Sequence, residues 1–395
     1  MRVLQVNSVC GRGSTGRIVV ALHDALRGSG DECRVVYGRG DHDPSVDATR
    51  IDSTLSVGIH VGLARLTDRQ GFYSRRATER LLEEIRRYSP EVIHLHNLHG
   101  YYLHLPTLFG YLQSAEIPVV WTLHDCWPFT GHCAYFDFVG CEKWRSECHK
   151  CPQKTSYPAS YVADRSNRNF EQKKSLYSKM GNMTIVTPSR WLADLVGQSI
   201  LNTNPVQVIG NGVDQNLFRP RPSALRERYG VGQRFMVLGV ASPWSARKGL
   251  QDFVRVADLL GPRFAIVLVG VDEGMAKRLP ASIICLPRTQ NVGELARIYT
   301  AADVFFNPTY EDNFPTTNLE ANACGTPVIT YNVGGSPETV AATAGYVVPA
   351  GDVSAAAEIM AALARSPKQK FIPSSSFNAH HMQSGYLRLY QRITG

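Results

Sequence analysis

The sequence predicts an α/β protein in which two domains are each built on a doubly wound, Rossmann-like parallel sheet. Short, nearly continuous apolar runs alternate with segments of helical period, which is typical of parallel strands covered by helices on both faces. This alternation occurs twice, and a Pro- and Arg-rich stretch at 218–222 separates the two series. With 395 residues the chain is too long for one ordinary core and long enough for two. We therefore expect the two sheets to face an interdomain cleft that binds ligand at the strands' carboxyl ends.

The first series starts at the N-terminus and continues to about residue 209. Its apolar runs predict strands at Arg2–Ser8, Cys33–Gly38, Val92–His96, Val119–His124, Thr184–Val186 and Val206–Ile209. The segments between them with a period of about 3.6 predict helices at Gly16–Arg27, Ala77–Tyr88, Leu105–Gln113 and Arg190–Val196.

The second series follows the Pro- and Arg-rich stretch and repeats the same pattern. Its predicted strands are Phe235–Val240, Ala265–Val271, Ser282–Leu286, Val304–Asn307 and Val328–Tyr331. Its predicted helices are Gly249–Leu260, Val292–Ala301, Thr316–Ala323 and Val353–Arg365. A last helix, Met382–Ile393, follows a serine-rich loop at 373–376.

Composition and charge narrow the class of partner. Hydrophobic residues make up 44% and charged residues 19%, which is typical of a folded globular protein. The formal charge of +8 favours anionic partners, but no nucleic-acid-binding signature accompanies the dispersed Lys and Arg, so we expect no nucleic acid partner. Phosphorylated substrates and an anionic membrane surface remain as the expected anionic partners.

Two basic amphipathic segments, 74–87 and 172–179, are either solvated helix faces or peripheral membrane contacts. No apolar run reaches about 18 residues and no signal peptide is present, so we expect a cytoplasmic protein, with the inner membrane face as a place of contact.

The strongest motif lies at 312–327, directly after the apolar strand ending at Asn307. Its first half is a loop and its second half a helix, with Pro315 expected in the first helical turn, where its missing N–H costs nothing. The free backbone N–H groups of this turn, around Asn313, Phe314 and Thr316, would form an anion site at the edge of the sheet. Two acids, Asp312 and Glu320, frame the loop.

This motif resembles the E-x7-E region of family 4, the large group of retaining GT-B glycosyltransferases, and within it the subfamily that builds surface polysaccharides. The resemblance extends in order through 208–214, Lys248-Gly249, 295–304, 334–338 and 386–390. It implies a GT-B fold in which the last helix returns to the first domain. The expected domains are therefore residues 1–207 plus 378–395, with a Cys-rich insertion at 126–152, and residues 208–377.

The resemblance also implies roles for individual residues. Lys248 would hold the diphosphate of a nucleotide-sugar donor, with Arg247 beside it in place of an arginine that the family has where Pro243 stands. Glu320 would hold the ribose and Asp312 the donor sugar, with Glu311 as the alternative acid. Asn313, Phe314, Pro315 and Thr316 would line the donor site. No divalent metal takes part in catalysis in this family, so we expect no catalytic cofactor.

The first domain contributes two further candidates. The loop Gly11–Arg17 follows the first strand and opens a helix, so we expect Gly13, Ser14 and Gly16 to line the cleft. His124 ends a strand at the same edge, and its family analogue contacts the donor sugar, whereas the alternative is a capped strand-end histidine. His94 and His96 share a strand without a carboxylate cluster, which favours core packing over a metal site.

The unusual feature of the chain is a cysteine cluster. Cys133, Cys141, Cys148 and Cys151 follow the pattern C-x7-C-x6-C-x2-C. In a cytosolic chain, four thiolates ending in a CxxC pair favour structural Zn²⁺ over disulfides. An iron–sulfur cluster and free thiols are the alternatives.

We therefore predict a retaining glycosyltransferase of hexosyltransferase type that uses a UDP- or GDP-sugar and a glycan or lipid-linked acceptor. The alternative function is a catalytically silent paralogue that binds a nucleotide sugar or a partner protein, which the retained Lys248 and Glu320 disfavour. A dinucleotide-dependent oxidoreductase is also disfavoured, because the loop at 11–16 lacks the G-x-G-x-x-G spacing.

Overall fold

The computed structural model describes residues 1–341, 343, 345–366 and 377–395 of the chain. These residues form two compact units. Unit 1 comprises Met1–Gly210 and Gln383–Gly395, and unit 2 comprises Asn211–Met382. The units divide a few residues later than the boundaries expected from the sequence, and the chain returns to unit 1 within its last helix. The serine-rich loop expected at 373–376 lies outside the described residues.

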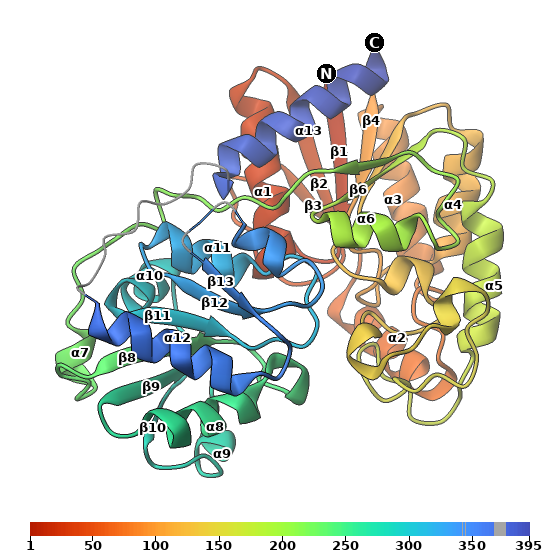
Figure 1. Cartoon of the computed structure of the whole chain (residues 1–395). Coiled ribbons are helices and arrows are strands. Elements are labelled where there is room, and N and C mark those ends of the chain that lie inside the picture. The colour runs from red at the N-terminus through yellow and green to blue at the C-terminus, as the bar shows by residue number, and fades with distance from the viewer. Residues whose placement is uncertain (342, 344, 367–376) are drawn as a thin grey trace. The chain divides into compact units, whose positions relative to one another are not determined.

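Unit 1 is built on a seven-stranded sheet in the order β3-β2-β1-β4-β5-β6-β7 (Figure 1), and all its paired strands are parallel. The strands are β1 (Arg2–Asn7), β2 (Glu32–Tyr37), β3 (Ala48–Arg50), β4 (Val92–Leu95), β5 (Val119–Thr122), β6 (Met183–Thr187) and β7 (Val206–Val208). The predicted parallel sheet is thus confirmed. The edge strand β3 was not predicted, because its three half-exposed residues form no apolar run.

Helices cover both faces of this sheet. They are α1 (Gly13–Gly28), α2 (Thr54–Thr67), α3 (Arg75–Tyr88), α4 (Leu105–Ser114), α5 (Ser166–Tyr177), α6 (Arg190–Val196) and most of α13 (Ala379–Thr394). In α3, Ala77, Leu81, Leu82 and Ile85 are buried along one face, and arginines occupy the exposed face. The basic segment at 74–87 is therefore an amphipathic helix whose apolar face is already covered by protein.

Side-chain hydrogen bonds fasten α13 to the sheet of unit 1. The hydroxyl of Tyr390 lies 2.6 Å from Nδ1 of His94 on β4, and the hydroxyl of Tyr386 lies 2.9 Å from Oγ1 of Thr122 on β5. All four side chains are buried. The last helix therefore contributes to the core of unit 1, as Figure 1 shows by its position along β1 and α1.

Unit 2 repeats the design with a six-stranded parallel sheet in the order β10-β9-β8-β11-β12-β13. Its strands are β8 (Phe235–Val240), β9 (Phe264–Val269), β10 (Ile283–Leu286), β11 (Val304–Asn307), β12 (Val328–Tyr331) and β13 (Gly345–Val348), the last of which was not predicted. Its helices are α7 (Leu225–Arg228), α8 (Leu250–Leu260), α9 (Glu273–Ala276), α10 (Val292–Ala301), α11 (Thr316–Ala323) and α12 (Val353–Arg365). Successive β8 residues Met236 and Val237 belong to different core clusters, so the sheet is buried on both faces.

The strand order fixes where each unit can bind a ligand. In a doubly wound sheet the order reverses at one point, and the loops leaving the two strands there diverge to leave a crevice at their carboxyl ends. In unit 1 this switch point lies between β1 and β4, and in unit 2 it lies between β8 and β11. The loop after β8 carries Arg247 and Lys248, and the loop after β11 carries Asp312.

Candidate functional site

In unit 2, backbone contacts hold the two switch-point loops against each other. The Tyr310 N–H donates to the carbonyl of Arg247 at 2.8 Å, and Nη1 of Arg247 donates back to the carbonyl of Glu311 at 2.5 Å. Gly249 makes this crossing possible: its φ is +69°, and a Cβ there would lie 2.1 Å from the carbonyl oxygen of Pro308. The loops are therefore held in place before any ligand binds.

The side chains of Lys248 and Asp312 meet between these loops. Nζ of Lys248 lies 2.5 Å from Oδ2 of Asp312, and the two side chains are 24% and 18% exposed. Lys248 ends a short 3-10 turn, Ala246–Lys248, whereas Asp312 precedes α11. The structure thus brings together, over 64 residues of sequence, the two charged groups predicted to hold the diphosphate and the sugar.

The two neighbouring acids of this loop, Glu311 and Asp312, differ in their exposure to solvent. Glu311 is completely buried, whereas the Asp312 side chain is partly exposed beside Lys248. The backbone carbonyl of Asp312 also accepts a hydrogen bond from the N–H of Gly335, which anchors the loop to the turn after β12. Asp312 is therefore the accessible acid of the two.

The helix α11 begins at Thr316, as predicted, but Pro315 precedes its first turn. Pro315 is its N-cap residue, with no side-chain cap, and Thr316 is its first helical residue. The N-cap side chain therefore accepts no hydrogen bond from the first N–H groups of this eight-residue helix. Phe314 and Asn313, just before the cap, are buried. This arrangement can bind an anion at the carboxyl edge of the sheet.

Glu320 lies one turn into α11 and is 3% exposed. The hydroxyl of Tyr299, on α10, donates to its Oε2 at 3.1 Å. This hydrogen bond orients the carboxylate, and Tyr299 was not identified from the sequence as a functional residue. Tyr299 lies five residues before the strand β11, a position typical of an ordinary core aromatic residue. Only its hydrogen bond to Glu320 distinguishes it from such a residue.

In unit 1, the glycine-rich loop forms the start of α1. Gly13 is the first helical residue with a φ of +66°, and it and Ser14 are exposed. Gly16 is buried instead, and a Cβ there would lie 3.1 Å from the amide nitrogen of Gly11. Gly16 therefore allows the turn to close, whereas Gly13 and Ser14 lie on the surface, and the ligand site at these three residues stays a prediction.

His124 follows β5 at the carboxyl edge and belongs to a chain of histidines. Its Nε2 lies 3.1 Å from Nδ1 of His96, and His96 Nε2 lies 3.1 Å from Oε1 of Gln5. Burial lowers the pKa of His124 to about 4, although Asp125 opposes this shift. Burial also holds the pKa values of His94 and His96 well below 6.5. All three imidazoles are therefore neutral at pH 7, and His94 and His96 are core residues.

A second polar group at the same edge escaped the sequence analysis. Nε2 of His99 lies 2.7 Å from Oδ2 of Asp125, and its Nδ1 lies 2.9 Å from the hydroxyl of Tyr157. Burial alone would raise the pKa of Asp125, but His99 and the Trp127 N–H stabilise the carboxylate and keep the pKa below its usual value. His99 and Asp125 each follow a strand end, which is the signal that could have paired them.

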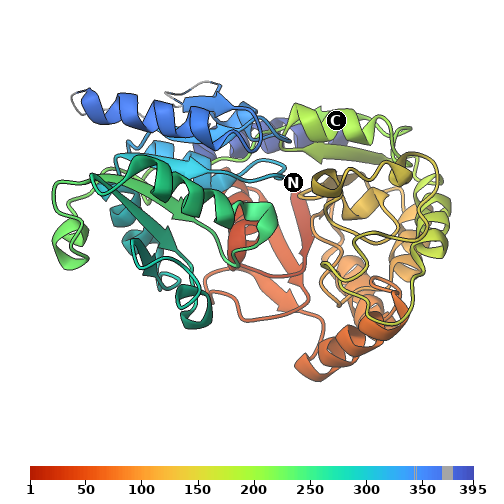
Figure 2. The ribbon, with the colours of Figure 1, turned by 60° about the horizontal axis from the view of Figure 1, so that its bottom comes forward.

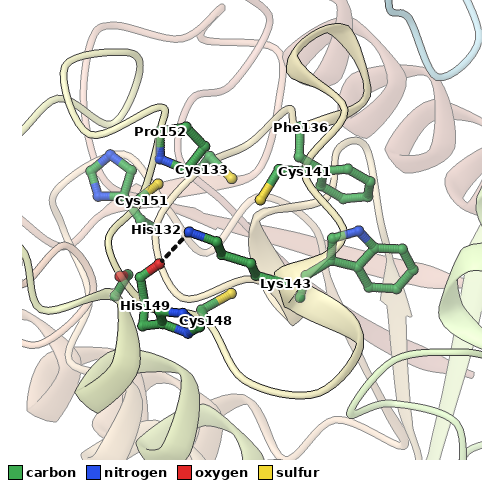
Figure 3. A pocket seen from close by; sticks show the side chains of 11 residues that line it. His132, Cys133, Phe136, Cys141, Lys143, Cys148, His149, Cys151 and Pro152 are labelled. Carbon is green, nitrogen blue, oxygen red and sulfur yellow. Dashed lines mark hydrogen bonds between the residues drawn. The ribbon is translucent and has the colours of Figure 1, made fainter.

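Four of the five cysteines of the insertion, Cys133, Cys141, Cys148 and Cys151, line one small cavity in unit 1 together with His132 and Lys143 (Figure 3). The structure places none of the nine cysteines, all of which it describes, in a disulfide. Among the residues the structure describes, no three His, Cys, Asp or Glu side chains are close enough as they stand to hold a metal ion together. Nζ of Lys143 donates to the carbonyls of His149 and Lys150, each at 3.1 Å.

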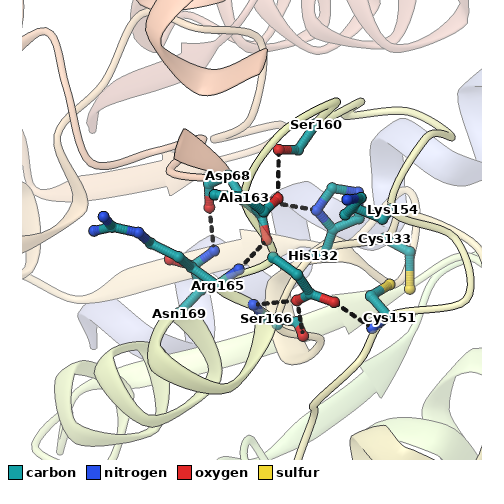
Figure 4. A network of polar contacts seen from close by, with 12 residues as sticks. Asp68, His132, Cys133, Cys151, Lys154, Ser160, Ala163, Arg165, Ser166 and Asn169 are labelled. Atoms are coloured by element: carbon teal, nitrogen blue, oxygen red, sulfur yellow. Dashed lines mark hydrogen bonds and ion pairs between the residues drawn. The ribbon is translucent and has the colours of Figure 1, made fainter. Parts of the chain in front are cut away.

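A polar network ties this insertion to the end of α2 (Figure 4). A carboxylate oxygen of Asp68 contacts Nδ1 of His132, and its other oxygen accepts from the N–H of Arg165 at 2.7 Å. The Asp164 carboxylate accepts from the N–H groups of Cys151 and Ser166. These contacts fix both ends of the cysteine segment to the surrounding unit.

Comparison with known proteins supports the sequence-based resemblance. The family model described as Glycosyltransferase Family 4 matches residues 15–217, and that described as glycosyl transferases group 1 matches residues 225–372. A putative colanic acid biosynthesis glycosyl transferase, WcaC of Escherichia coli K12, is 24% identical over 417 residues and covers 100% of both chains. A D-inositol 3-phosphate glycosyltransferase of Saccharomonospora viridis is 28% identical over 204 residues, 46% of this chain and 47% of that protein.

Solved structures share the fold along the whole chain. Sucrose-phosphate synthase from Thermosynechococcus elongatus matches with a TM-score of 0.69 at 17% identity, covering 99% of this chain and 98% of that one. Anabaena HepE in complex with UDP and glucose matches with a TM-score of 0.66 at 17% identity, covering 99% and 100%. The predicted pair of doubly wound domains is thus confirmed as a fold.

Proposed function

The chain belongs to glycosyltransferase family 4 and has the two-domain GT-B fold, and from this premise we propose that it moves a hexose from a nucleotide sugar to a glycan or glycolipid acceptor with retention of configuration. One observation carries the proposal: Lys248 and Asp312 meet at the switch point of unit 2, beside the uncapped start of α11. A cation, an anion site and an acid for sugar hydroxyls are what binding a sugar diphosphate requires.

Stabilisation of the leaving diphosphate would come from the protein alone. As the bond between sugar and phosphate breaks, negative charge develops on the phosphate, and prearranged donors lower the energy of that state. Lys248, Arg247 and the N–H groups at the start of α11 are such donors, with Asn313, Phe314, Pro315 and Thr316 forming the loop around them. Glu320 would hold the ribose hydroxyls and Asp312 those of the sugar. No divalent metal is needed in this scheme.

For His124 we propose contact with the donor sugar near the reacting carbon. Because its pKa lies at about 4, the imidazole is neutral at pH 7. A neutral group does not oppose the positive charge that develops on the sugar ring, whereas an imidazolium would. The leaving phosphate would then guide the acceptor to the same face of the sugar, which retains the configuration.

For the nucleotide of the donor, we propose to test UDP first and GDP second. The HepE structures, which share only the fold, contain UDP, UDP and glucose, or UDP-glucose. For the acceptor, the full-length relative WcaC is named for colanic acid biosynthesis. We therefore propose an intermediate of a surface polysaccharide, carried on a lipid, as the acceptor of this chain.

A lipid-linked acceptor would be met at a membrane surface, and α2 offers the face for it. Leu55, Ile59 and Leu66 are 76%, 56% and 56% exposed along this helix, and Leu63 lies between them on the same side. Tyr161 and Val162 are also exposed and lie at its end, where the Tyr161 N–H donates to the carbonyl of Arg65 at 2.8 Å. Figure 2 shows α2, in orange, at the periphery of unit 1.

The charge around this apolar face matches an anionic bilayer surface. Arg65 is exposed on α2 itself, and Arg75 and Arg76 follow Ser74, whose hydroxyl contacts His60 of α2 at 2.8 Å. Exposed aliphatic side chains flanked by arginine are the features of a helix that lies in the lipid interface. None of the helices in the described ranges is long and apolar enough to cross a membrane.

Liposome flotation tests the membrane part of the proposal. We expect the wild type to float with vesicles containing anionic lipid, and a Leu55→Ser/Ile59→Ser variant to remain in solution. Leu259→Ser is the matched control, because Leu259 is 58% exposed on α8 of unit 2. Equal flotation of the double variant and the wild type would rule out α2 as the contact.

Turnover of a donor panel tests the activity itself. The chain is incubated with UDP-, GDP-, ADP- and dTDP-sugars, and hydrolysis and transfer are measured with and without EDTA. We expect one donor class to turn over, undiminished by brief EDTA treatment, and to be lost in Lys248→Ala and Glu320→Ala. Tight nucleotide binding without any turnover would favour the silent paralogue instead.

A further inference from the structure

The fold gathers four cysteines from three separate turns around one cavity. Cys133 follows the turn at Gly131, Cys141 follows the 3-10 turn Asp137–Val139, and Cys148 and Cys151 flank a turn in which Lys150 has a φ of +43°. A side-chain hydrogen bond joins Cys133 and Cys151. In Figure 3 the four side chains surround that of Lys143. Residues spread over a segment without strands or α-helices are thus brought to one place.

The backbone around these sulfurs provides hydrogen-bond donors to them. The N–H of Gly131 donates to Sγ of Cys148 at 3.3 Å. Glycine is required there, because a Cβ would lie 2.0 Å from the carbonyl oxygen of Ser166 and 2.8 Å from Cβ of Cys148. N–H groups directed at sulfur stabilise thiolates, and such contacts accompany metal-bound cysteines.

Two lysines beside the cluster lack an anionic partner. Lys173, on α5, is 1% exposed, and its Nζ donates to the carbonyls of Trp127 and Thr130 at 2.6 and 3.0 Å. It also lies 3.4 Å from the centre of the Trp127 ring. In the described part of the chain neither Lys173 nor Lys143 forms an ion pair with a carboxylate. A buried ammonium group is stabilised by a nearby counter-ion, so a negative centre beside Lys173 would stabilise the fold.

We propose that Cys133, Cys141, Cys148 and Cys151 bind one Zn²⁺ as thiolates and that Lys143 and Lys173 balance its charge. Four thiolates and one Zn²⁺ carry a net charge of about −2, which two ammonium groups neutralise. The cavity that the four cysteines and Lys143 line has a volume of about 10 Å³, which is room for one water-sized sphere. Binding requires rotation about the cysteine χ1 bonds, which have three staggered wells.

The zinc would be structural. Four protein ligands leave no open coordination position for a substrate or a water. The ion would order the segment that runs from the carboxyl end of β5 to the start of α5. That segment carries Tyr157, whose hydroxyl contacts His99 at the carboxyl edge of the unit 1 sheet. Loss of zinc would therefore loosen the wall beside His99 and Asp125 without touching the donor residues of unit 2.

Zinc content tests the proposal. The full chain is produced with added zinc, freed of loosely bound metal, and measured by mass spectrometry of its metals. We expect about one zinc per chain in the wild type, and less than about a tenth of that in Cys148→Ser and Cys151→Ser. Cys285→Ser is the matched control, because Cys285 lies in unit 2, and it should keep its zinc. Lys173→Met should retain zinc but release it to a chelator about tenfold faster.

The absorption of bound Co²⁺ provides a second measurement, which uses the wild type and so does not depend on the folding of a cysteine variant. Co²⁺ added to the zinc-free wild type should produce the intense thiolate-to-metal charge-transfer absorption of a four-thiolate site. The proposal is overturned by a chain that takes up neither ion, by iron in place of zinc, or by a mass lower by two hydrogens that reveals a Cys133–Cys151 disulfide. Undiminished zinc in Cys148→Ser would overturn it as well.

Discussion

Nζ of Lys248 lies 2.5 Å from Oδ2 of Asp312, so two groups that we propose for different parts of one donor form an ion pair with each other. The pair joins the loop after β8 to the loop after β11. If a diphosphate binds here as proposed, Lys248 would exchange a carboxylate for phosphate oxygens, which would release Asp312 toward the sugar. The ion pair would then couple the two halves of donor recognition.

This coupling predicts opposite effects on the affinity for UDP. Lys248→Met should weaken UDP binding by about 10- to 100-fold, since a hydrogen bond between charged groups contributes about 1.5–3 kcal/mol. Asp312→Asn should leave UDP affinity unchanged or improve it, because UDP has no sugar and Lys248 is no longer occupied. The same variant should reduce turnover of the nucleotide sugar.

Isothermal titration calorimetry with UDP, beside a turnover assay, measures both effects. Lys277→Met is the control, because this exposed lysine of unit 2 lies outside the switch-point loops. If Asp312→Asn weakened UDP binding as much as Lys248→Met, the assigned division of roles would be wrong.

A second prediction concerns Glu320 and Tyr299. If Glu320 holds the ribose hydroxyls, the wild type should bind UDP better than 2′-deoxy-UDP, and Glu320→Gln should reduce this preference. Tyr299→Phe removes the hydroxyl that donates to Oε2 of Glu320 at 3.1 Å, and it should weaken UDP binding by a smaller factor. It should also lower the free energy of unfolding by about 1 kcal/mol. Competition binding with the two nucleotides provides the measurement, and an unchanged preference in Glu320→Gln would contradict the ribose role.

A third prediction is that unit 1 loses stability in mild acid. His94, His96 and His124 are neutral in the folded chain because burial lowers their pKa values, to about 4 in the case of His124. In the unfolded chain they bind protons as the pH falls through 6.5. Protons therefore favour the unfolded state, and stability should be lost as the pH drops from about 6.5 toward 4. At pH 5 the loss should be on the order of 1–2 kcal/mol for each fully buried histidine.

Unit 2 supplies an internal comparison for this acid effect. Of the 12 histidines, only His380 and His381 lie in unit 2, and neither is buried. Thermal unfolding followed by hydrogen exchange at pH 7 and pH 5 should show the larger loss of protection in β4 and β5. Equal losses in both units would argue against the buried histidines as the cause.

A fourth prediction concerns the last helix. Tyr390→Phe removes the hydroxyl 2.6 Å from Nδ1 of His94 and leaves that buried nitrogen unpaired. We expect a loss of about 1–3 kcal/mol in the free energy of unfolding, the usual cost of an unsatisfied buried group. Urea denaturation measures it, with Tyr161→Phe as the control because Tyr161 is 60% exposed. A cost no larger than that of the control would mean that water replaces the hydroxyl.

The candidate residues were found from the sequence to the extent that each follows a strand end. Lys248, Asp312, Gly13 and His124 all come shortly after an apolar run, and parallel strands place such positions at one edge of a sheet. The close approach of Gly16 to the backbone of Gly11 could not be predicted, because the sequence does not show whether a loop glycine faces a ligand or a neighbouring backbone. Tyr299 and His99 were missed because their roles depend on partners, Glu320 and Asp125, that lie 21 and 26 residues away.

The sequence by itself determined the two parallel sheets, most of their strands and helices, and the edge at which the candidate residues lie. These follow from hydrophobic period and chain order, which are local properties. Only the tertiary structure decided that Lys248 and Asp312 pair, that the four cysteines share a cavity with Lys143, and that α2 exposes its apolar side chains. Such features depend on which surfaces the rest of the chain covers, and contacts between residues distant in sequence decide that.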